Sequence, residues 1–251
     1  MALPPEMGSF AQDFIGVKRN GFTVSIDQDT MKRLSLCFLL FLPTVLTAQV
    51  FDNVSEIATP VGINAMEPAL FGIAGGSIIM SWTEPDGTGF AVKTATLQGG
   101  NWSRTVTITT SNSMVVNWAD FTTVAAFNDG TVAVSWLQEN TNIPYAYDIN
   151  IALSSDAGQT WGSPIVPHDD QSTRQHGFLT LLPTERDEMI AVWLDAREYN
   201  NQSPGDSFGN SVQLRSTAIG KDWTLGKDIP LELRTCSCWS TSAAISEGGT
   251  V

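Results

Sequence analysis

A repeated segment ending in tryptophan constrains the fold of this chain more than any other feature. Three runs of apolar and β-branched residues end at Trp82, Trp136 and Trp193, which are 54 and 57 residues apart. A second tryptophan follows each run with spacings of 59 and 62 residues, at Trp102, Trp161 and Trp223. Two independent markers with nearly the same period indicate an internal repeat.

Each repeat is long enough for four short strands, and the chain is rich in turn residues, with 21 Gly and 12 Pro. Four strands per unit of this length are typical of a β-propeller blade. We therefore expect an all-β fold of four-stranded antiparallel blades at residues 66–109, 120–165 and 176–230, with a fourth blade beginning near residue 240. A β-sandwich with coincidental spacing is the alternative.

The second marker lies in a turn with a defined pattern. Residues 154–161 read Ser-Ser-Asp-Ala-Gly-Gln-Thr-Trp and match S-x-D-x-G-x-T-W at every fixed position, the pattern called an Asp-box. We expect Asp156 to accept hydrogen bonds from backbone N–H groups of the turn. Gly158 tolerates a positive φ, and Trp161 covers the hairpin. With Ser154, these residues are predicted to be structural.

Residues 31–48 have the layout of a secretory signal peptide. Two basic residues after Met31 precede an apolar run at 34–45 that is too short to span a bilayer, and Ala48 supplies the small residue before the cut. Residues 1–30 are then an unstructured extension upstream of the true start. The product is expected to be secreted or periplasmic, without membrane insertion after cleavage. A buried strand or core helix is the alternative.

Composition excludes some classes of function. The chain of 251 residues has a net charge of −13, and this excess of acid disfavours binding to nucleic acid. With two His and three Cys, a large metal cluster is disfavoured, and we expect neither a metal nor another cofactor.

The Asp-box on a propeller period resembles the sialidase-like superfamily, also called BNR-repeat proteins. The segments at 176–182, 191–197 and 236–238 are similar to secreted bacterial proteins of the exo-α-sialidase-like group. The resemblance implies a six-bladed propeller, of which about three blades are present here. Sialidases bind the substrate carboxylate with three Arg and use a Tyr–Glu nucleophile and an Asp acid.

Strand direction places the loops after each second strand, and the loops between blades, on one face of a propeller. These loops carry the catalytic candidates Asp195 and His176 and the substrate-binding candidates Arg174, Arg197 and Glu139. A guanidinium can hold a carboxylate with two parallel hydrogen bonds. This face is therefore the predicted ligand face.

Four of these five candidates also have another interpretation, and Arg174 is either a ligand contact or a solvated residue. Arg197 either grips a ligand carboxylate or pairs with Asp195 or Glu198. Asp195 is either a general acid or a carboxylate that anchors its loop. His176 is either an acid/base or ligand-binding group, or a hydrogen-bonded structural residue.

Two functions remain open. The first is a sialidase-like exo-glycoside hydrolase acting on terminal acidic sugars of glycans. The second is a non-catalytic secreted propeller that binds glycans or proteins, which is favoured because the early Arg-Ile-Pro motif of sialidases is missing at residues 63–69. Three blades cannot close a ring, so we expect the first function to be inactive in this chain alone.

Overall fold

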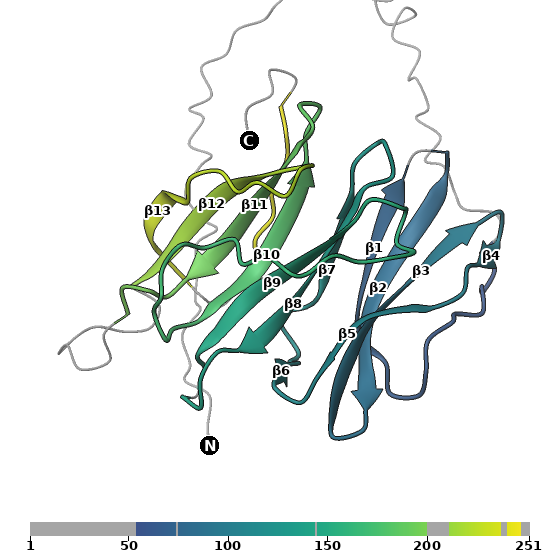
Figure 1. Cartoon of the computed structure of the whole chain (residues 1–251), viewed down its shortest axis with the longest axis horizontal. Coiled ribbons are helices and arrows are strands. Elements are labelled where there is room, and N and C mark those ends of the chain that lie inside the picture. The colour runs from purple at the N-terminus through teal and green to yellow at the C-terminus, as the bar shows by residue number, and fades with distance from the viewer. Residues whose placement is uncertain (1–53, 74, 144, 200–210, 237–239, 247–251) are drawn as a thin grey trace, which may run out of the picture. The chain divides into compact units, whose positions relative to one another are not determined.

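The computed structural model describes residues 54–73, 75–143, 145–199, 211–236 and 240–246 (Figure 1). Nearly all of them belong to the compact unit Glu56–Val251. The predicted upstream extension (1–30) and signal peptide (31–48) lie outside the described residues. The regular elements in the described ranges are all strands, and these ranges contain no helix long and apolar enough to cross a membrane.

The first sheet has five strands in an antiparallel meander. They are β1 (Met66–Ile73), β2 (Ser77–Asp86), β3 (Gly89–Gln98), β4 (Asn101–Trp102) and β5 (Val106–Ser111). The short β4 and the longer β5 both pair with β3. The sheet therefore runs from β1 on one edge to β4 and β5 on the other.

The second sheet is built around its central strand β8. Its strands are β6 (Met114–Val115), β7 (Thr123–Ala126), β8 (Val132–Glu139) and β9 (Tyr147–Ser154). Both β6 and β7 pair with β8 on one side and β9 pairs with it on the other. Beyond β9, a single antiparallel bridge joins Ile151 to Ile165 in the position of an outer strand.

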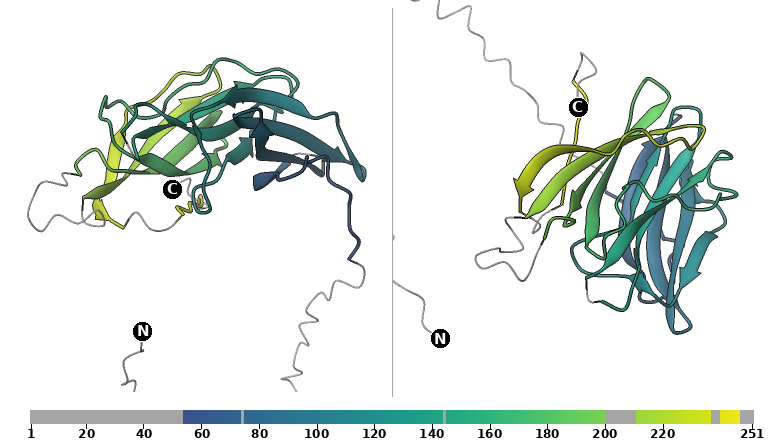
Figure 2. Two further views of the ribbon diagram at one scale, coloured as in Figure 1. Left: turned by 90° about the horizontal axis from the view of Figure 1, so that it is seen from below. Right: turned by 60° about the vertical axis from the view of Figure 1, so that its left-hand side comes forward.

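The third sheet is a regular four-stranded antiparallel meander. Its strands are β10 (His176–Pro183), β11 (Glu188–Asp195), β12 (Val212–Gly220) and β13 (Ile229–Thr235). The three sheets lie side by side in chain order (Figures 1 and 2). Consecutive antiparallel meanders arranged in this way are blades of a β-propeller, and the predicted all-β fold class is confirmed. Residues 240–246, where a fourth blade was expected to begin, form no regular element.

The two tryptophan markers occupy equivalent places in the three sheets. Trp82, Trp136 and Trp193 lie on β2, β8 and β11, which are paired on both sides, and each is at most 5% exposed. The later tryptophans follow β3, β9 and β12, the strands that come next in their sheets. In all three cases the next residue is hydrogen-bonded back to that strand, through the pairs Ser103–Thr96, Gly162–Leu153 and Thr224–Gly220.

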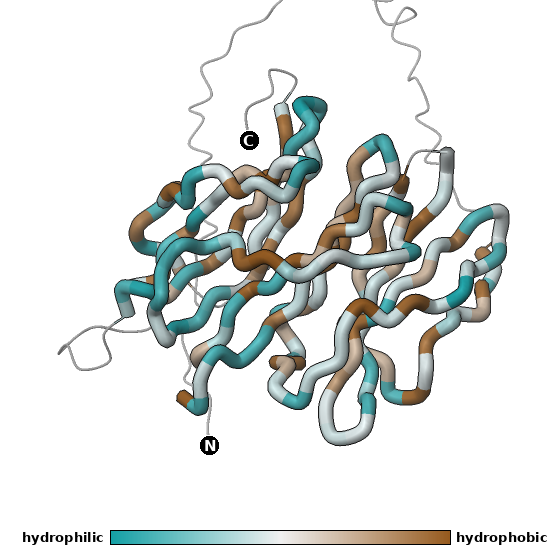
Figure 3. The backbone as a smooth tube through the Cα atoms, in the orientation of Figure 1, coloured by the Kyte–Doolittle hydropathy of each residue, from teal (hydrophilic) through white to brown (hydrophobic). Residues whose placement is uncertain are grey.

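Side-chain alternation buries the second sheet on both faces. Val132, Val134 and Trp136 of β8 pack toward the first sheet, in a cluster that includes Ile79 and Val92. The alternate residues of the same strand, Ala133 and Leu137, join a cluster that reaches Trp193 and Ile219 of the third sheet. Hydrophilic residues gather instead at the loops that join the strands (Figure 3). A period of two thus produces two apolar interfaces from one strand.

The inner strands β1, β7 and β10 lie next to one another, with β7 in the middle. Thr122 Oγ1, just before β7, donates a hydrogen bond to the carbonyl of Glu67 in β1 at 2.8 Å. Thr123 Oγ1 donates to the carbonyl of Leu179 in β10 at 3.0 Å. These bonds fix how the starts of the three inner strands face each other.

Truncation of a marker tryptophan tests this packing. Trp193 is fully buried and its Nε1 donates to Asp195 Oδ2 at 2.9 Å. We expect Trp193→Ala to lower the free energy of unfolding by about 3–5 kcal/mol, because a large cavity remains in the interface between two sheets. Trp118→Ala is the matched control, since Trp118 is 87% exposed, and it should change stability by at most about 0.5 kcal/mol. Urea denaturation measures both, and equal effects would contradict the assigned packing.

Candidate functional site

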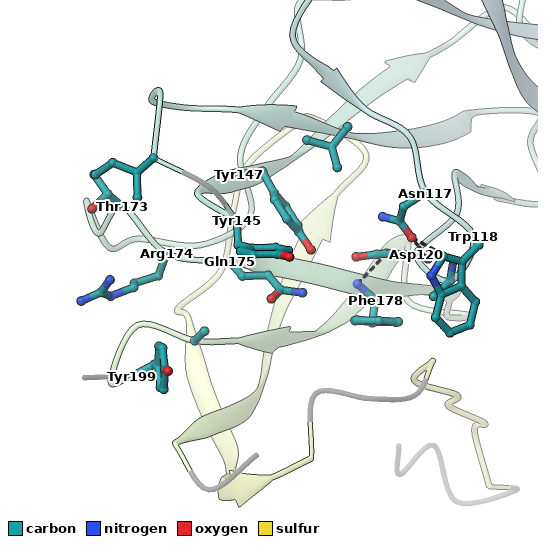
Figure 4. Close-up of a pocket in the computed structure, with 14 residues that line it drawn as sticks. Asn117, Trp118, Asp120, Tyr145, Tyr147, Thr173, Arg174, Gln175, Phe178 and Tyr199 are labelled. Carbon is teal, nitrogen blue, oxygen red and sulfur yellow. Dashed lines mark hydrogen bonds between the residues drawn. The ribbon is translucent and has the colours of Figure 1, made fainter. Parts of the chain in front are cut away.

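A cavity of about 650 Å³ opens where the starts of β7 and β10 meet the loops of the second and third sheets (Figure 4). Its lining residues come from the segments 115–120, 143–147, 173–178 and 196–199. They are Val115, Asn117, Trp118, Ala119, Asp120, Ile143, Tyr145, Tyr147, Thr173, Arg174, Gln175, Phe178, Ala196 and Tyr199. The wall is thus rich in aromatic residues and contains few charges.

Asp120 is the single acidic residue among the described residues that line this cavity. Its Oδ1 accepts a hydrogen bond from the backbone N–H of Phe178 at 2.7 Å, drawn in Figure 4. Its Oδ2 is buried and has no hydrogen-bond partner in the described structure. A buried polar atom without a partner is costly, so Oδ2 is the atom of this pocket that most needs a proton or a ligand.

The loop before β7 fixes the position of Asp120. The Oδ1 atom of Asn117 accepts hydrogen bonds from the backbone N–H groups of Ala119 and Asp120, both at 2.8 Å. Glu67 Oε1 in turn accepts a bond from the backbone N–H of Asn117 at 2.9 Å. Asn117 therefore links the carboxyl group of Glu67 to the backbone of Asp120.

The inner strands on either side are irregular at this same level. The β1–β2 register shifts between Met66 and Ala69, and the β10–β11 register shifts between Gly177 and Thr180. Within these two irregularities, Glu67 and Phe178 both have φ of 55°. Bulges of this kind re-aim side chains and backbone donors. Here they turn the Phe178 N–H toward Asp120.

Gly177 makes room for the carboxyl group. A Cβ atom on this residue would collide with Asp120 Oδ2 and would also approach the ring of Tyr147. The Tyr147 hydroxyl points toward the Asp120 carboxyl in Figure 4. The absence of a side chain at residue 177 thus lets β10 pass directly beneath the acid.

Both buried carboxyl groups are held partly protonated near neutral pH. Burial raises the pKa of Asp120 to about 7, against the effect of the Phe178 N–H, and the charge of Glu67 adds to the increase. Burial also raises the pKa of Glu67 to about 7, although hydrogen bonds from Asn117, Thr83 and Thr122 oppose it. Interacting acids of this kind titrate as a pair. A protonated Asp120 can donate from the oxygen that lacks a partner.

Tyr147 is a neutral phenol in this setting. Burial raises its pKa above the usual range of a phenol, and the charge of Asp120 shifts the pKa in the same direction. A phenol with a raised pKa is a poor nucleophile, because the phenolate is the reactive form. Tyr147 is therefore suited to donating or accepting hydrogen bonds.

Of the predicted ligand-binding residues, Arg174 lines the cavity. In the described part of the chain, no carboxylate lies within ion-pair distance of its guanidinium. Glu139 is exposed at the end of β8 and does not line the cavity. The structure thus brings Arg174 to the Asp120 pocket, whereas Glu139, which is paired with Tyr147, is not part of the described lining.

The other three predicted residues form a buried ionic cluster between the second and third sheets. Arg197 donates two bonds to the carboxylate of Asp195, from Nε at 2.9 Å and from Nη2 at 2.8 Å. The same guanidinium contacts Asp228 at 2.7 Å and Asp169 at 3.1 Å. Although burial opposes it, the hydrogen bonds to Asp195 and Asp228 raise the pKa of Arg197 above its usual range. Arg197 is thus fully engaged by protein carboxylates.

His176 and Asp195 are both completely buried. His176 Nε2 lies 3.0 Å from Asp170 Oδ1 and 3.7 Å from Asp195 Oδ2. Burial alone would lower the pKa of His176, but the bonds to Asp148 and Asp170 and the charge of Asp195 raise it to about 9. In this arrangement Asp195 anchors Trp193 and Arg197, and neither His176 nor Asp195 lines the cavity.

The turn at 154–161 has the bonds expected of its pattern. Asp156 Oδ1 accepts hydrogen bonds from the backbone N–H groups of Gln159 at 3.0 Å and Thr160 at 2.8 Å. Ser154 Oγ accepts from the N–H of Gly158 at 2.8 Å, and Gly158 has φ of 86°. Trp161 packs against the cluster between the first and second sheets. This turn is remote from the cavity lining.

Comparisons with known proteins find only partial structural similarity at low sequence identity. No protein-family model and no curated protein matches it. A protein of unknown function from Dyadobacter fermentans aligns with 13% identity and a TM-score of 0.49, covering 66% of this chain and 54% of its own. An α-L-arabinofuranosidase of Fusarium graminearum, in complex with an iminosugar inhibitor, aligns with 15% identity and a TM-score of 0.43, and the alignment covers 70% of this chain and 50% of that protein. A Penicillium chrysogenum α-L-arabinanase complexed with arabinobiose aligns with 15% identity and a TM-score of 0.42, and the alignment covers 66% of this chain and 49% of that protein.

The chain therefore spans about half the length of these structures. Two of them are named as an arabinofuranosidase and an arabinanase, rather than as sialidases. The assignment of blades in this chain rests on its own strand order and register.

The sequence patterns selected neither Glu67 nor Asp120 as a site residue. The residues that make them distinctive, Asn117 and Phe178, act on them across 50 and 58 positions of the chain. One signal was present, since Glu67, Asp120 and His176 all lie at the start of an inner strand and so recur with the repeat. A titratable residue at or just before the start of an inner strand is therefore the sequence signal for this site.

The raised pKa values predict a pH dependence of stability. When an acid has a raised pKa in the folded state, the unfolded chain ionises first as the pH rises. The free energy of unfolding therefore falls between about pH 4 and about pH 7. Asp120→Asn removes this loss, so the stability of the variant relative to the wild type should rise by roughly 2–4 kcal/mol between pH 4 and pH 8. Urea denaturation across this range measures the difference. The exposed Asp86→Asn control should show a constant difference, and a pH-independent difference for Asp120→Asn would contradict burial of the acid.

Proposed function

We propose that this propeller is a glycoside hydrolase that binds a glycan in the Asp120 pocket and uses Asp120 as its acid. One observation carries the proposal: a buried carboxyl group with a pKa of about 7 and one oxygen without a partner lines a cavity of about 650 Å³. A carboxylic acid that keeps its proton near neutral pH can protonate the oxygen that leaves a glycosidic bond.

The rest of the pocket suits a sugar. Trp118 and Tyr145 are 87% and 75% exposed at the cavity, so they offer flat apolar surfaces to the face of a sugar ring. Asn117 and Gln175 add amide groups that can bind hydroxyls. Apolar walls with a few directed polar groups are the usual composition of a small-ligand pocket.

Arg174 supports a finer proposal about the substrate. Arg174 lies at the edge of the pocket (Figure 4), and the described structure places no carboxylate within ion-pair distance of its guanidinium, so it can pair with a carboxylate on a terminal acidic sugar. Arg197 cannot share this role while four aspartates surround it. The proposed acidic-sugar specificity, sialic acid included, therefore depends on one Arg of the described pocket rather than on three.

Non-catalytic glycan binding is the second candidate function. Hydrolases of this kind normally use two carboxyl groups that flank the scissile bond. Glu67 does not line the cavity, and its two oxygens accept bonds from Asn117 and Thr83. Within the described lining, Asp120 has no second carboxyl group as a partner, and this favours binding without turnover.

Replacement of Asp120 separates the two functions. Three open blades led us to expect no turnover by this chain alone, but all described residues that line the cavity lie within 115–199, so the 251-residue chain contains this pocket and can be assayed directly. We expect the wild type to release a sugar from a panel of oligosaccharides, and Asp120→Asn to release it about 10²–10⁴ times more slowly with unchanged ligand affinity, because the acid is lost while the shape remains. Mass spectrometry of products and calorimetric titration measure the two quantities.

The exposed Asp86→Asn variant is the control and should retain full turnover. Binding without release by the wild type would establish the second candidate. A wild type that neither binds nor cleaves any glycan of the panel would reject both functions.

Replacement of Arg174 tests the acidic sugar. Loss of one charge-assisted contact of about 1.5–3 kcal/mol should weaken a carboxylated ligand roughly ten- to hundredfold in Arg174→Ala and leave its neutral analogue unaffected. Arg174→Lys should recover part of the affinity, because an ammonium binds a carboxylate as a point charge. Arg186→Ala, at an exposed position of the third sheet, is the control. Equal affinity of wild type and Arg174→Ala for the acidic ligand would exclude this role.

A further inference from the structure

The side chains of the Asp120 pocket have a definite order. Figure 4 shows Trp118 on one side of Asp120, and Arg174 on the other side at the edge of the pocket. Tyr145 lies between Arg174 and Asp120 in the same view, and the Arg174 side chain extends away from Asp120. The cation and the acid of this pocket are therefore separated, with an aromatic ring between them.

The path of β10 supports this separation. The Asp120 carboxyl group lies over Gly177 and Phe178, since it would collide with a Cβ atom on Gly177 and accepts the N–H of Phe178. Arg174 precedes Gly177 by three residues, and Gln175 between them is bridged to Tyr147 of β9. Three residues of extended chain span roughly 10 Å. The backbone thus holds Arg174 well apart from the carboxyl group of Asp120.

Tyr145 is presented to the pocket at a cost in backbone energy. Its φ is 65°, a value that a bulky side chain rarely adopts. The ring nevertheless lines the cavity and stays exposed, so the strained backbone gains no buried packing from it. Strain of this kind at a cavity indicates a role in binding. A flat ring between Arg174 and Asp120 is a platform for one sugar.

We propose that the pocket takes a hexuronic acid, with its ring on Tyr145 and its carboxylate at Arg174. This inference rests on the proposed function, because it sets the glycosidic oxygen against Asp120. A hexuronic acid carries its carboxyl group on C5, on the far side of the ring oxygen from the anomeric carbon. The carboxylate and the glycosidic oxygen can then meet two protein groups that lie apart.

A sialic acid fits this arrangement less well. Its carboxyl group is bonded to the anomeric carbon itself, so its cation has to stand beside the acid that protonates the glycosidic oxygen. Arg174 is the single basic residue in the described lining of the cavity. Arg197 is held by Asp195 and Asp228 at 2.8 and 2.7 Å. The described pocket thus offers no cation next to Asp120.

Trp118 is placed to hold the sugar on the other side of the glycosidic bond. It precedes Asp120 by two residues, in the loop that the side chain of Asn117 fixes through the N–H groups of Ala119 and Asp120. Its exposed indole lies on the side of Asp120 away from Arg174 (Figure 4). An aromatic face there can stack on the leaving sugar. The inferred ligand is therefore a chain of at least two sugars that ends in a hexuronic acid.

Calorimetric titration of the whole chain tests this order, in the wild type and in Asp120→Asn, which prevents cleavage. The probes are a disaccharide ending in glucuronic acid, the same disaccharide with its carboxyl group reduced to an alcohol, free glucuronic acid, and sialyllactose. We expect the acidic disaccharide to bind ten- to hundredfold more tightly than the reduced one, because one charge-assisted contact distinguishes them. Sialyllactose should bind no more tightly than the reduced probe.

Two aromatic variants locate the sugars. Tyr145→Ala should weaken both free glucuronic acid and the disaccharide about three- to tenfold, and Tyr145→Phe should bind as the wild type does. Trp118→Ala should weaken the disaccharide by a similar factor and leave free glucuronic acid unchanged. Phe121→Ala is the matched control, because this exposed aromatic residue is close to Trp118 in the chain but does not line the cavity.

The outcomes separate this inference from the proposed function. Tighter binding of sialyllactose than of the glucuronic acid disaccharide would overturn the inference and leave glycan binding by the pocket intact. Equal affinity for the acidic and the reduced disaccharide would overturn it too. So would a Trp118→Ala variant that loses free glucuronic acid together with the disaccharide. A chain that binds none of the probes or of the wider oligosaccharide panel would reject the proposed function as well.

Discussion

Burial of the second sheet on both of its faces is the constraint on which the rest of the structure depends. Because β8 alternates between two apolar interfaces, a shift of one residue would send Trp136 and Leu137 to the wrong sides. The fixed register places β7 between β1 and β10. Asp120, three residues before β7, can then receive the N–H of Phe178 from β10. The geometry of the pocket is thus a consequence of side-chain alternation some fifteen residues away along the chain.

The two buried acids, Glu67 and Asp120, lower the stability of the folded state. Glu67 and Asp120 are 6% and 4% exposed, and each has a pKa near 7 because the charged form is poorly solvated. Apolar residues of similar size at these two positions would stabilise the fold at least as well. Two irregular inner strands, each with a side-chain-bearing residue at positive φ, add further local strain. Features that a fold tolerates at a cost to its stability are candidates for chemistry, which is why we place the acid at Asp120.

The sequence predicted the repeat, the all-β class and the tryptophan positions, because these follow from local periodicity. The turn around Asp156 was equally readable, since its bonds join residues at most four positions apart. The role of Arg197 was not readable: Asp195 is two residues away, but Asp169 and Asp228 reach it across 28 and 31 positions. Likewise, nothing local indicated that His168 and His176 stack between Asp148 and Asp170. The site is formed by contacts between sheets, and such long-range contacts cannot be recognised in a single sequence.

Charge compensation distinguishes Arg197 from Arg174, a distinction that the sequence patterns do not provide. Arg197 lies within 3.2 Å of carboxylate oxygens from Asp169, Asp170, Asp195 and Asp228, so a ligand carboxylate would have to displace one of them and leave it buried without a partner. Arg174 carries the same charge at the cavity with no protein carboxylate within ion-pair distance in the described structure. A ligand anion meets no competitor there. In a protein with twice as many acids as bases, an arginine left uncompensated at a cavity is the position where an anionic group gains most.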